Sequence, residues 1–297
     1  MTPQEILGLV AQRHGVVLRD EGPCPGGEVG ARYASGTGGE RFVYKWFERE
    51  DLAWAERVVT QVARLRSAGY PAPRYLDPFP VDDDVVVLVQ EQAPGAWSDD
   101  LSAARVDQLL AINERQVGLG EPGSSWGDFM AQTLCQGADG YCLHDTLRRE
   151  GGTAGRVLEW VHEVGRELGP LPQGDLVHLD FHHRNVLWDG EGNGNVTVID
   201  MEGCQPGERA FDLVTLAIFL DYAEVPNLDT PVWTLLEALT TPERLRAYAA
   251  HMVLRRLDWT LRFHRDELHR STAAAASAVW RVDPDSAARV FRESPHL

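Results

Sequence analysis

The stretch that decides the fold runs from His178 to Asp212 and reads HLDFHHRNVLWDGEGNGNVTVIDMEGCQPGERAFD. After an opening polar cluster comes a short apolar run at 186–188. Residues 189–194 are dense in turn formers, and the β-branched run at 196–199 then ends at Asp200. Two short strands around a glycine-rich loop predict a β-hairpin.

The pairing of this hairpin brings three oxygen-bearing side chains toward one another. If Trp188 lies near Val196, antiparallel pairing carries Asn185 to within a residue of Asp200, with Asp180 just upstream on the loop that enters the hairpin. Two carboxylates and an amide oxygen suit a hard cation that keeps some of its water. The donor set therefore indicates Mg²⁺ rather than zinc.

Two other interpretations of the same residues stay open. Asp and Asn often flank hairpins simply because they favour turns. Alternatively, the imidazoles of His178, His182 and His183 could hold zinc for a metal hydrolase. The zinc hypothesis accounts neither for Asn185 nor for the hairpin.

The spacing H-x-D-x-x-x-x-N followed by a strand-ending Asp is that of a kinase catalytic centre. In particular, the stretch resembles the aminoglycoside phosphotransferase family of the protein kinase-like fold, with antibiotic kinases of the capreomycin and viomycin kind as one candidate branch. In that family the metal Asp lies in an I-D-W-E-like string, here IDME at 199–202, and a D-L-A-like helix start follows, here DLV at 212–214. Leu179 stands where the family usually has Gly, and Met201 where it has Trp.

The resemblance implies a role for each polar residue of the stretch. Asp180 would be the catalytic base, Asn185 and Asp200 the Mg²⁺ ligands, and Asp212 a brace for the catalytic loop. ATP would be the phosphoryl donor, with GTP as an open alternative.

Lys45 is the only lysine among 28 basic residues, in a chain that otherwise uses arginine. It lies in a predicted strand at 42–47, where alternation places it on one face with Val43 and Phe47. A surface charge could have been arginine, whereas a compact ammonium suits a phosphate contact. Lys45 is therefore a candidate nucleotide-binding residue.

The segments around Lys45 follow the kinase order. A glycine-rich loop containing Gly26 and Gly27 precedes it and could cradle phosphates through backbone N–H groups. An Asp51-capped helix is predicted over 52–68, and its Glu56 is favoured over Glu50 as the carboxylate partner of Lys45.

A fully apolar strand is predicted over 85–89, and the chain leaves it through Glu91, Ala93 and a Pro-Gly pair. In the resembled family this exit is the hinge, so backbone groups near Glu91 and Ala93 would bind adenine. Beyond it the sequence is mostly helical, with helices predicted over 213–222, 231–239 and 242–265.

We therefore predict an α+β, bilobal protein kinase-like fold. A small antiparallel-sheet N-lobe (residues 1–93) would bind nucleotide, and a larger helical C-lobe (94–297) would carry the catalytic loop, the metal ligands and the substrate site.

Composition bounds the partners. The formal charge of −17 argues against nucleic acid and anionic membranes and favours a cationic small-molecule substrate. Solubility alone is the alternative explanation of this charge. No apolar run approaches the roughly 18 residues of a membrane span, and four cysteines without metal-ligand spacing suggest a cytoplasmic protein. We expect a monomer or a weak dimer.

The expected activity is ATP-dependent O-phosphorylation of a polycationic antibiotic, either an aminoglycoside or a basic cyclic peptide. Glu202, Asp99 and Asp258 are the candidate substrate carboxylates. A metabolite kinase for choline or homoserine is the first alternative, and a catalytically silent nucleotide-binding protein of the same fold is the second.

Overall fold

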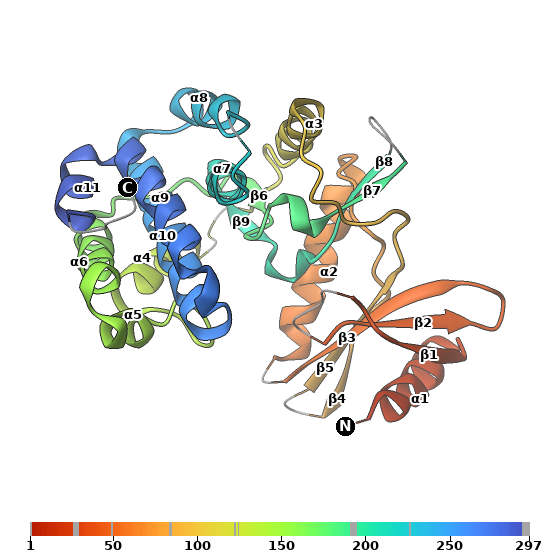
Figure 1. The fold of residues 1–297 in the computed structure, drawn as a ribbon. Coiled ribbons are helices and arrows are strands. Elements are labelled where there is room, and N and C mark those ends of the chain that lie inside the picture. The colour runs from red at the N-terminus through yellow and green to blue at the C-terminus, as the bar shows by residue number, and fades with distance from the viewer. Residues whose placement is uncertain are drawn as a thin grey trace. The chain divides into compact units, whose positions relative to one another are not determined.

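The computed structural model describes residues 2–25, 30–48, 50–82, 85–121, 123, 125–190, 195–225 and 227–292. It is an α+β protein that divides into two compact units (Figure 1). The first unit comprises Met1–Ser98 and Arg184–Cys204, and the second comprises Asp99–His183 and Gln205–Leu297. The sequence had predicted a single boundary at residue 94, so the predicted hairpin belongs to a different unit from the one expected.

The first unit is built on a five-stranded antiparallel sheet in the order β1-β2-β3-β5-β4. Two helices accompany it. Thr2 forms a capping box with Glu5 at the start of the first, and the Asp51 side chain caps the second, as predicted, by accepting from the N–H of Trp54. The elements are α1 (Pro3–His14), β1 (Leu18–Pro23), β2 (Arg32–Gly36), β3 (Arg41–Glu48), α2 (Leu52–Ser67), β4 (Phe79–Asp82) and β5 (Val85–Glu91).

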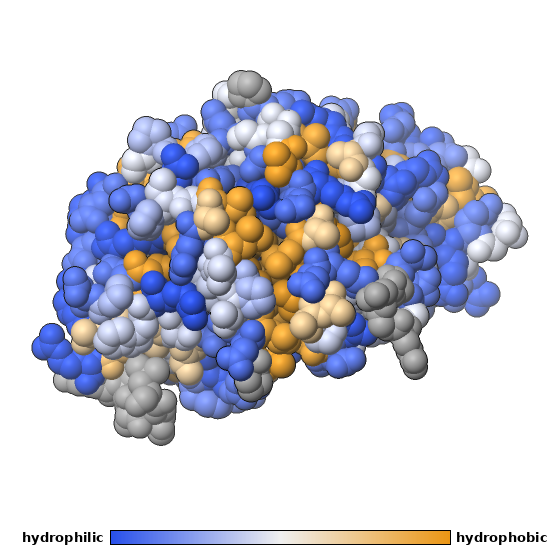
Figure 2. All heavy atoms as spheres, turned by 90° about the horizontal axis from the view of Figure 1, so that it is seen from above, coloured by the Kyte–Doolittle hydropathy of each residue, from blue (hydrophilic) through white to orange (hydrophobic). Residues whose placement is uncertain are grey.

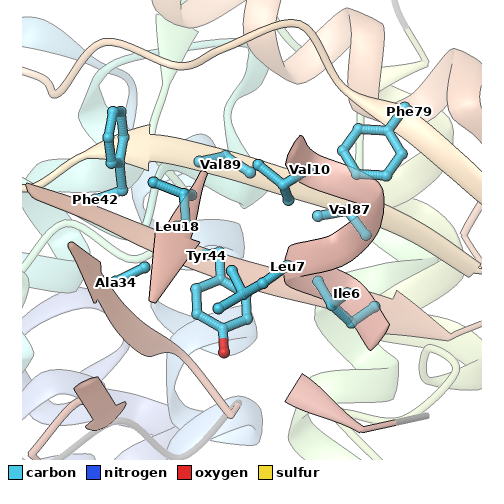
Figure 3. Close-up of a cluster of buried hydrophobic side chains, with 10 residues drawn as sticks. All are labelled: Ile6, Leu7, Val10, Leu18, Ala34, Phe42, Tyr44, Phe79, Val87 and Val89. Atoms are coloured by element: carbon cyan, nitrogen blue, oxygen red, sulfur yellow. The ribbon is translucent and has the colours of Figure 1, made fainter. Parts of the chain in front are cut away.

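One face of the sheet is covered by α1. Figure 3 shows the apolar side chains of α1 lying against those of the strands. Strand alternation selects which strand residues take part, because Tyr44 pairs with Val89 and both point to this face. The cluster comprises Ile6, Leu7, Val10, Leu18, Ala34, Phe42, Tyr44, Phe79, Val87 and Val89.

Lys45 points to the opposite face, where it shares its orientation with Val43 and Phe47 as predicted. On this face the ring of Phe47 contacts Trp54 of α2 edge-on, with centroids 5.0 Å apart. The alternation along β3 therefore places Lys45 on the same face as two half-buried apolar residues, and its own exposure is only 8%.

The predicted hairpin is present as β7 (Val186–Asp189) and β8 (Asn195–Val198), with Trp188 paired to Val196 as predicted. Both of its edges bond to the N-terminal chain. The N–H of Val198 donates to Pro71 O at 2.7 Å, and Trp188 and Ala96 exchange two backbone hydrogen bonds. These bonds explain why the hairpin belongs to the first unit.

Gly95 makes the second of these contacts feasible. It has φ +94°, and a Cβ there would lie 2.6 Å from the carbonyl oxygen of Trp188. Only glycine lets the two backbones approach this closely.

The second unit is mostly helical, and the predicted helices after residue 212 are confirmed with bounds shifted by up to three residues. Helix α7 is buried almost all round, as expected of a central helix. The elements are α3 (Ala103–Glu114), α4 (Trp126–Gln136), α5 (His144–Glu150), α6 (Gly152–Glu167), β6 (Asp175–Val177), β9 (Gln205–Gly207), α7 (Ala210–Tyr222), α8 (Thr230–Leu239), α9 (Pro242–Phe263), α10 (Leu268–Val282) and α11 (Pro284–Val290). Among the described residues, single-turn 3-10 helices are η1 (His183–Asn185) at the boundary of the two units, η2 (Met201–Gly203) in the first unit and η3 (Arg265–Glu267) in the second.

The surface seen in Figure 2 is mainly hydrophilic, with smaller groups of apolar residues between the polar ones. This fits the strongly acidic composition. Within the described part of the chain, no helix is both long and apolar enough to cross a membrane.

Candidate active site

The metal ligands predicted from the hairpin come from its open end in the first unit. The N–H of Ile199 donates to Asn185 O at 2.9 Å, so Asn185 is paired one residue away from Asp200, as predicted. Asp200 itself has φ +65°, a left-handed conformation that Asp adopts more readily than most residues. This turn ends β8 and starts η2, which carries Glu202.

Lys45 is held by two carboxylates of that turn. Its Nζ lies 2.6 Å from Asp200 Oδ1 and 2.9 Å from Glu202 Oε1. The hydroxyl of Tyr75 donates to the same Glu202 oxygen at 3.3 Å. Glu202 Oε2 is buried and has no hydrogen-bond partner among the described residues.

The charges of this cluster do not balance. Burial disfavours the charged form of Lys45, but the adjacent Glu202 and Asp200 outweigh it and raise the pKa of Lys45 above its usual value. Burial also raises the pKa of Glu202, with Asp200 adding to the effect and Lys45 opposing it. The carboxylates of Asp200 and Glu202 share the one ammonium of Lys45. The three side chains together therefore carry one formal negative charge, at a partly buried site.

The predicted pairing of Lys45 with Glu56 is wrong. Helix α2 buries Ala55, Val58, Val62 and Leu65, whereas Glu56 lies just outside that stripe with an exposed side chain. One residue turns a helix by about 100°, which is enough to move a side chain from the sheet to solvent. Helix α2 instead packs against η2, so η2 supplies the carboxylate that the sequence had assigned to α2.

The predicted substrate contact at Glu202 is also revised, because Glu202 is buried and already paired. Its side chain is only 10% exposed, and Lys45 and Tyr75 occupy the oxygen that has partners.

Asp180, the predicted base, lies in the second unit on the loop after β6. Its Oδ1 is 3.0 Å from Arg255 Nη2 and 3.4 Å from His182 Nε2. Burial alone would raise the pKa of Asp180, but Arg255 and then His182 lower it far below its usual value. The carboxylate is therefore ionised across the physiological pH range.

The loop that carries Asp180 is braced by Asp212, as the resemblance implied. The Asp212 carboxylate is fully buried and accepts three hydrogen bonds: from the N–H of His178 (2.7 Å), from the N–H of Leu179 (3.0 Å) and from Gln116 Nε2 (2.7 Å). Burial raises the pKa of Asp212, and these donors and the nearby His178 oppose that shift.

Leu179 explains the preference of the family for glycine at its position. It has φ +70°, in the left-handed region that costs a non-glycine residue about 1–2 kcal/mol. The bond from its N–H to Asp212 helps to hold this conformation. A strained backbone next to a reacting group is typical of functional loops.

The zinc alternative finds no support in the described part of the chain. No three His, Cys, Asp or Glu side chains converge on a metal position within the described residues. The Nδ1 of His178 accepts from the N–H of Asp180 at 3.2 Å, and the ring of His182 stacks on Phe219 with centroids 3.9 Å apart. His178 is thus engaged with the backbone of the loop, and His182 with helix α7.

The predicted hinge residues Glu91 and Ala93 lie at and just after the end of β5, and their contact with adenine stays a prediction. The N–H of Glu91 donates to Arg74 O at 2.8 Å, and its carboxylate pairs with Arg74 Nη2 at 2.6 Å. The N–H of Gln92 donates to Arg41 O, and Phe42 of β3 is the residue paired with Glu91 of β5. This is a non-hydrogen-bonded pair of the antiparallel strands, so the backbone N–H and C=O of Glu91 point away from β3. Ala93 follows directly. Gly26 and Gly27 lie outside the described residues.

Asp258 is not placed to bind substrate. Its side chain is fully buried and forms a bidentate pair with Arg262, with nitrogen–oxygen distances of 3.0 and 2.8 Å. Asp99 is exposed at the start of the second unit and stays a prediction.

Sequence reasoning missed Arg255, Tyr75 and Gln116. Arginine is used throughout this chain, so Arg255 carried no signal, and nothing marked Tyr75. Gln116 could have been found, because it continues the apolar spacing of α3 from Leu109 and Ile112 as a polar residue, and it is fully buried.

Comparison with known proteins supplies an independent view of the chain. The model of the phosphotransferase enzyme family matches residues 22–248. A comparison with curated protein sequences gives no significant match.

Solved structures resemble the chain over nearly its whole length. Aminoglycoside phosphotransferase APH(4)-Ia has a TM-score of 0.62 at 20% identity and covers 97% of this chain and 99% of its own. Amicoumacin kinase hAmiN, in complex with AMP-PNP, Ca²⁺ and Ami, has a TM-score of 0.61 at 15% identity and covers 96% and 94%. An aminoglycoside-3'-phosphotransferase of type VIII has a TM-score of 0.57 at 20% identity and covers 83% and 96%. At these identities the likeness establishes the fold.

Proposed function

Because the chain belongs to the phosphotransferase enzyme family, we propose that it transfers the γ-phosphoryl group of ATP to a hydroxyl of a cationic small molecule. The acceptor oxygen would form a bond to the γ-phosphorus while the bond from that phosphorus to the ADP leaving oxygen breaks. The proton of the hydroxyl would pass to Asp180. The observation that carries the proposal is the ionised Asp180 on a loop held by Asp212, together with the Lys45 cluster.

Lys45 would bind the phosphates of the nucleotide. Its two carboxylate partners keep it protonated and fix its Nζ from two sides. The ammonium carries three N–H donors, so one would remain for a phosphate oxygen while the other two face the carboxylates. Backbone groups near Glu91 and Ala93 would bind adenine.

The residues of the hairpin fit a divalent cation. Asp200 and Asn185 supply oxygen donors, and the buried Glu202 Oε2 is an oxygen without a protein partner among the described residues. The excess negative charge of the cluster would favour a cation. Mg²⁺ bound there would neutralise charge on the transferring phosphoryl group.

For the acceptor, we favour a polycationic antibiotic, either an aminoglycoside or a basic cyclic peptide. The net charge of −17 would attract such a molecule and raise its local concentration. Structural relatives support the class: a thermostable mutant of APH(4)-Ia was solved with ADP and hygromycin B, and hAmiN with Ami. Asp99 is the remaining candidate substrate carboxylate.

An ADP-release assay across aminoglycosides, basic cyclic peptides, macrolides, choline and homoserine tests the proposal. We expect turnover with a polycation, and an apparent KM that rises between low and physiological salt because screening weakens the attraction. Turnover of choline or homoserine alone would favour the metabolite-kinase alternative. A thermal shift with ATP but no turnover of any acceptor would favour the silent nucleotide-binding protein.

Asp180→Asn is the decisive variant. Loss of the base should lower kcat by about 100-fold or more while the thermal shift with ATP persists. Asp145→Asn, which removes an exposed carboxylate from α5 in the same unit, is the matched control. Wild-type turnover by Asp180→Asn would refute the role of Asp180.

A further inference from the structure

The catalytic loop of the second unit is held by a side chain that no sequence motif identifies, Arg255 of α9. Its Nη1 donates to the carbonyl oxygen of Leu179 at 2.7 Å, and its Nη2 lies 3.0 Å from Oδ1 of Asp180. One planar guanidinium therefore spans a backbone carbonyl and the carboxylate of the next residue. We propose that Arg255 is a positioning residue that fixes the Asp180 carboxylate for its reaction with the acceptor hydroxyl. The inference rests on the proposed function, in which Asp180 is the base.

The backbone before Asp180 needs restraint on both sides. Leu179 has φ +70°, so this peptide lacks the intrinsic preference that would hold it in place. The Leu179 N–H is bound by Asp212 and the Leu179 carbonyl by Arg255. Asp212 thus holds the peptide group before Leu179, and Arg255 holds the one after it. Together they set the direction in which the Asp180 side chain projects from the loop.

Arginine suits this position because its nitrogens form a rigid fork. A lysine ammonium could reach the carboxylate or the carbonyl, but it could not hold both at a fixed separation. The fork is supported from another element, since the Arg255 guanidinium carbon lies 6.0 Å from the ring centroid of Tyr141. The Arg255 side chain is only 28% exposed, so it is not a freely moving surface group.

The test compares Arg255→Gln and Arg255→Lys with wild type, using the acceptor identified by the ADP-release assay. Arg255→Gln should lower kcat on the order of 100-fold, as expected for a misplaced reacting group, with little change in KM for ATP. Arg255→Lys should recover part of kcat. Arg244→Gln is the matched control, because Arg244 lies on the same helix and pairs with another carboxylate, Glu208, at 3.5 Å.

The pH profile separates positioning from simple support of the fold. The charged and titratable groups facing Asp180 are Arg255, His182 and His178, and those facing Arg255 besides Asp180 are Tyr141, Cys142 and His251. Without the guanidinium, Asp180 should bind a proton more readily, so the acid limb of kcat should move to higher pH in Arg255→Gln and much less in Arg255→Lys.

A double-mutant cycle in thermal unfolding needs no acceptor. The loss of melting temperature on Arg255→Gln should shrink when Asp180 is already Asn, because the ion pair is then absent. An unmoved acid limb with wild-type kcat, or fully additive melting shifts, would overturn the inference. If Asp180→Asn retains wild-type turnover, the proposed function fails instead, and the cycle still reports whether the two side chains are coupled.

Discussion

Replacing Asp212 by Asn changes a single atom of the brace that holds the catalytic loop. In the native structure all three partners of the carboxylate are donors, so the group serves as an ionised acceptor. Gln116 cannot turn its amide to offer oxygen, because its Oε1 already accepts from Asn113 Nδ2 at 2.7 Å. The new amide nitrogen must therefore face a donor in either orientation.

The cost can be counted from these contacts. With the Asn oxygen at the position of Oδ2, the bonds from His178 and Gln116 survive and the Leu179 N–H loses its acceptor. The reverse orientation loses two bonds. The better orientation thus breaks one buried bond to a charged group, which costs about 2 kcal/mol. For a chain of 297 residues that corresponds to a fall in melting temperature of about 3 °C, because unfolding carries an entropy of roughly 2.1 cal/mol/K per residue.

Thermal unfolding followed by circular dichroism, together with kcat, measures the effect. Asp221→Asn, which removes a carboxylate from the end of the same helix, is the control and should shift melting much less. We also expect kcat of Asp212→Asn to fall about tenfold or more, because the peptide before Asp180 is released. A melting temperature and a kcat equal to those of wild type would refute the role given to Asp212.

Two further predictions concern other buried groups. Lys45→Arg should lose most phosphoryl transfer while staying folded, because a guanidinium is too large to meet Asp200, Glu202 and a phosphate from one point. An activity assay together with a melting curve checks this. Retained turnover would contradict it. His251 is fully buried with neither ring nitrogen hydrogen-bonded within the described residues, and burial, reinforced by Arg255, lowers the pKa of His251 to about 3. A neutral His251 is favoured in the folded protein, so the free energy of unfolding is highest above the unfolded pKa of about 6.5. Through His251 alone, the free energy of unfolding should decline by about 1.4 kcal/mol as the pH falls from 7.5 to 5.5. Denaturant unfolding of His251→Phe should lack that part of the decline, with the exposed His269→Gln as control, and an unchanged slope would show that His251 does not carry it.

The sequence by itself determined the features that depend on neighbouring residues and on turn chemistry. The short apolar run at 186–188 and the β-branched run at 196–199 predicted the register of the hairpin, and with it the nearness of Asn185 to Asp200. Alternation along β3 set the face on which Lys45 lies. The spacing from His178 to Asp212 carried the resemblance from which the bracing of the loop was inferred.

Only the tertiary structure decided which partner each buried charge meets. The sequence favoured Glu56 over Glu50 as the partner of Lys45, whereas the structure pairs Lys45 with Asp200 and Glu202. The side-chain direction of Glu56 depended on the rotation of α2 about its own axis, where a single residue changes that direction by about 100°. Asp258 looked like a substrate carboxylate until its pairing with Arg262 was visible. Arg255 reaches a carbonyl 76 residues earlier in the chain, and in a sequence rich in arginine no local pattern distinguishes it. Such contacts are fixed by how whole helices pack, which residue spacing alone does not specify.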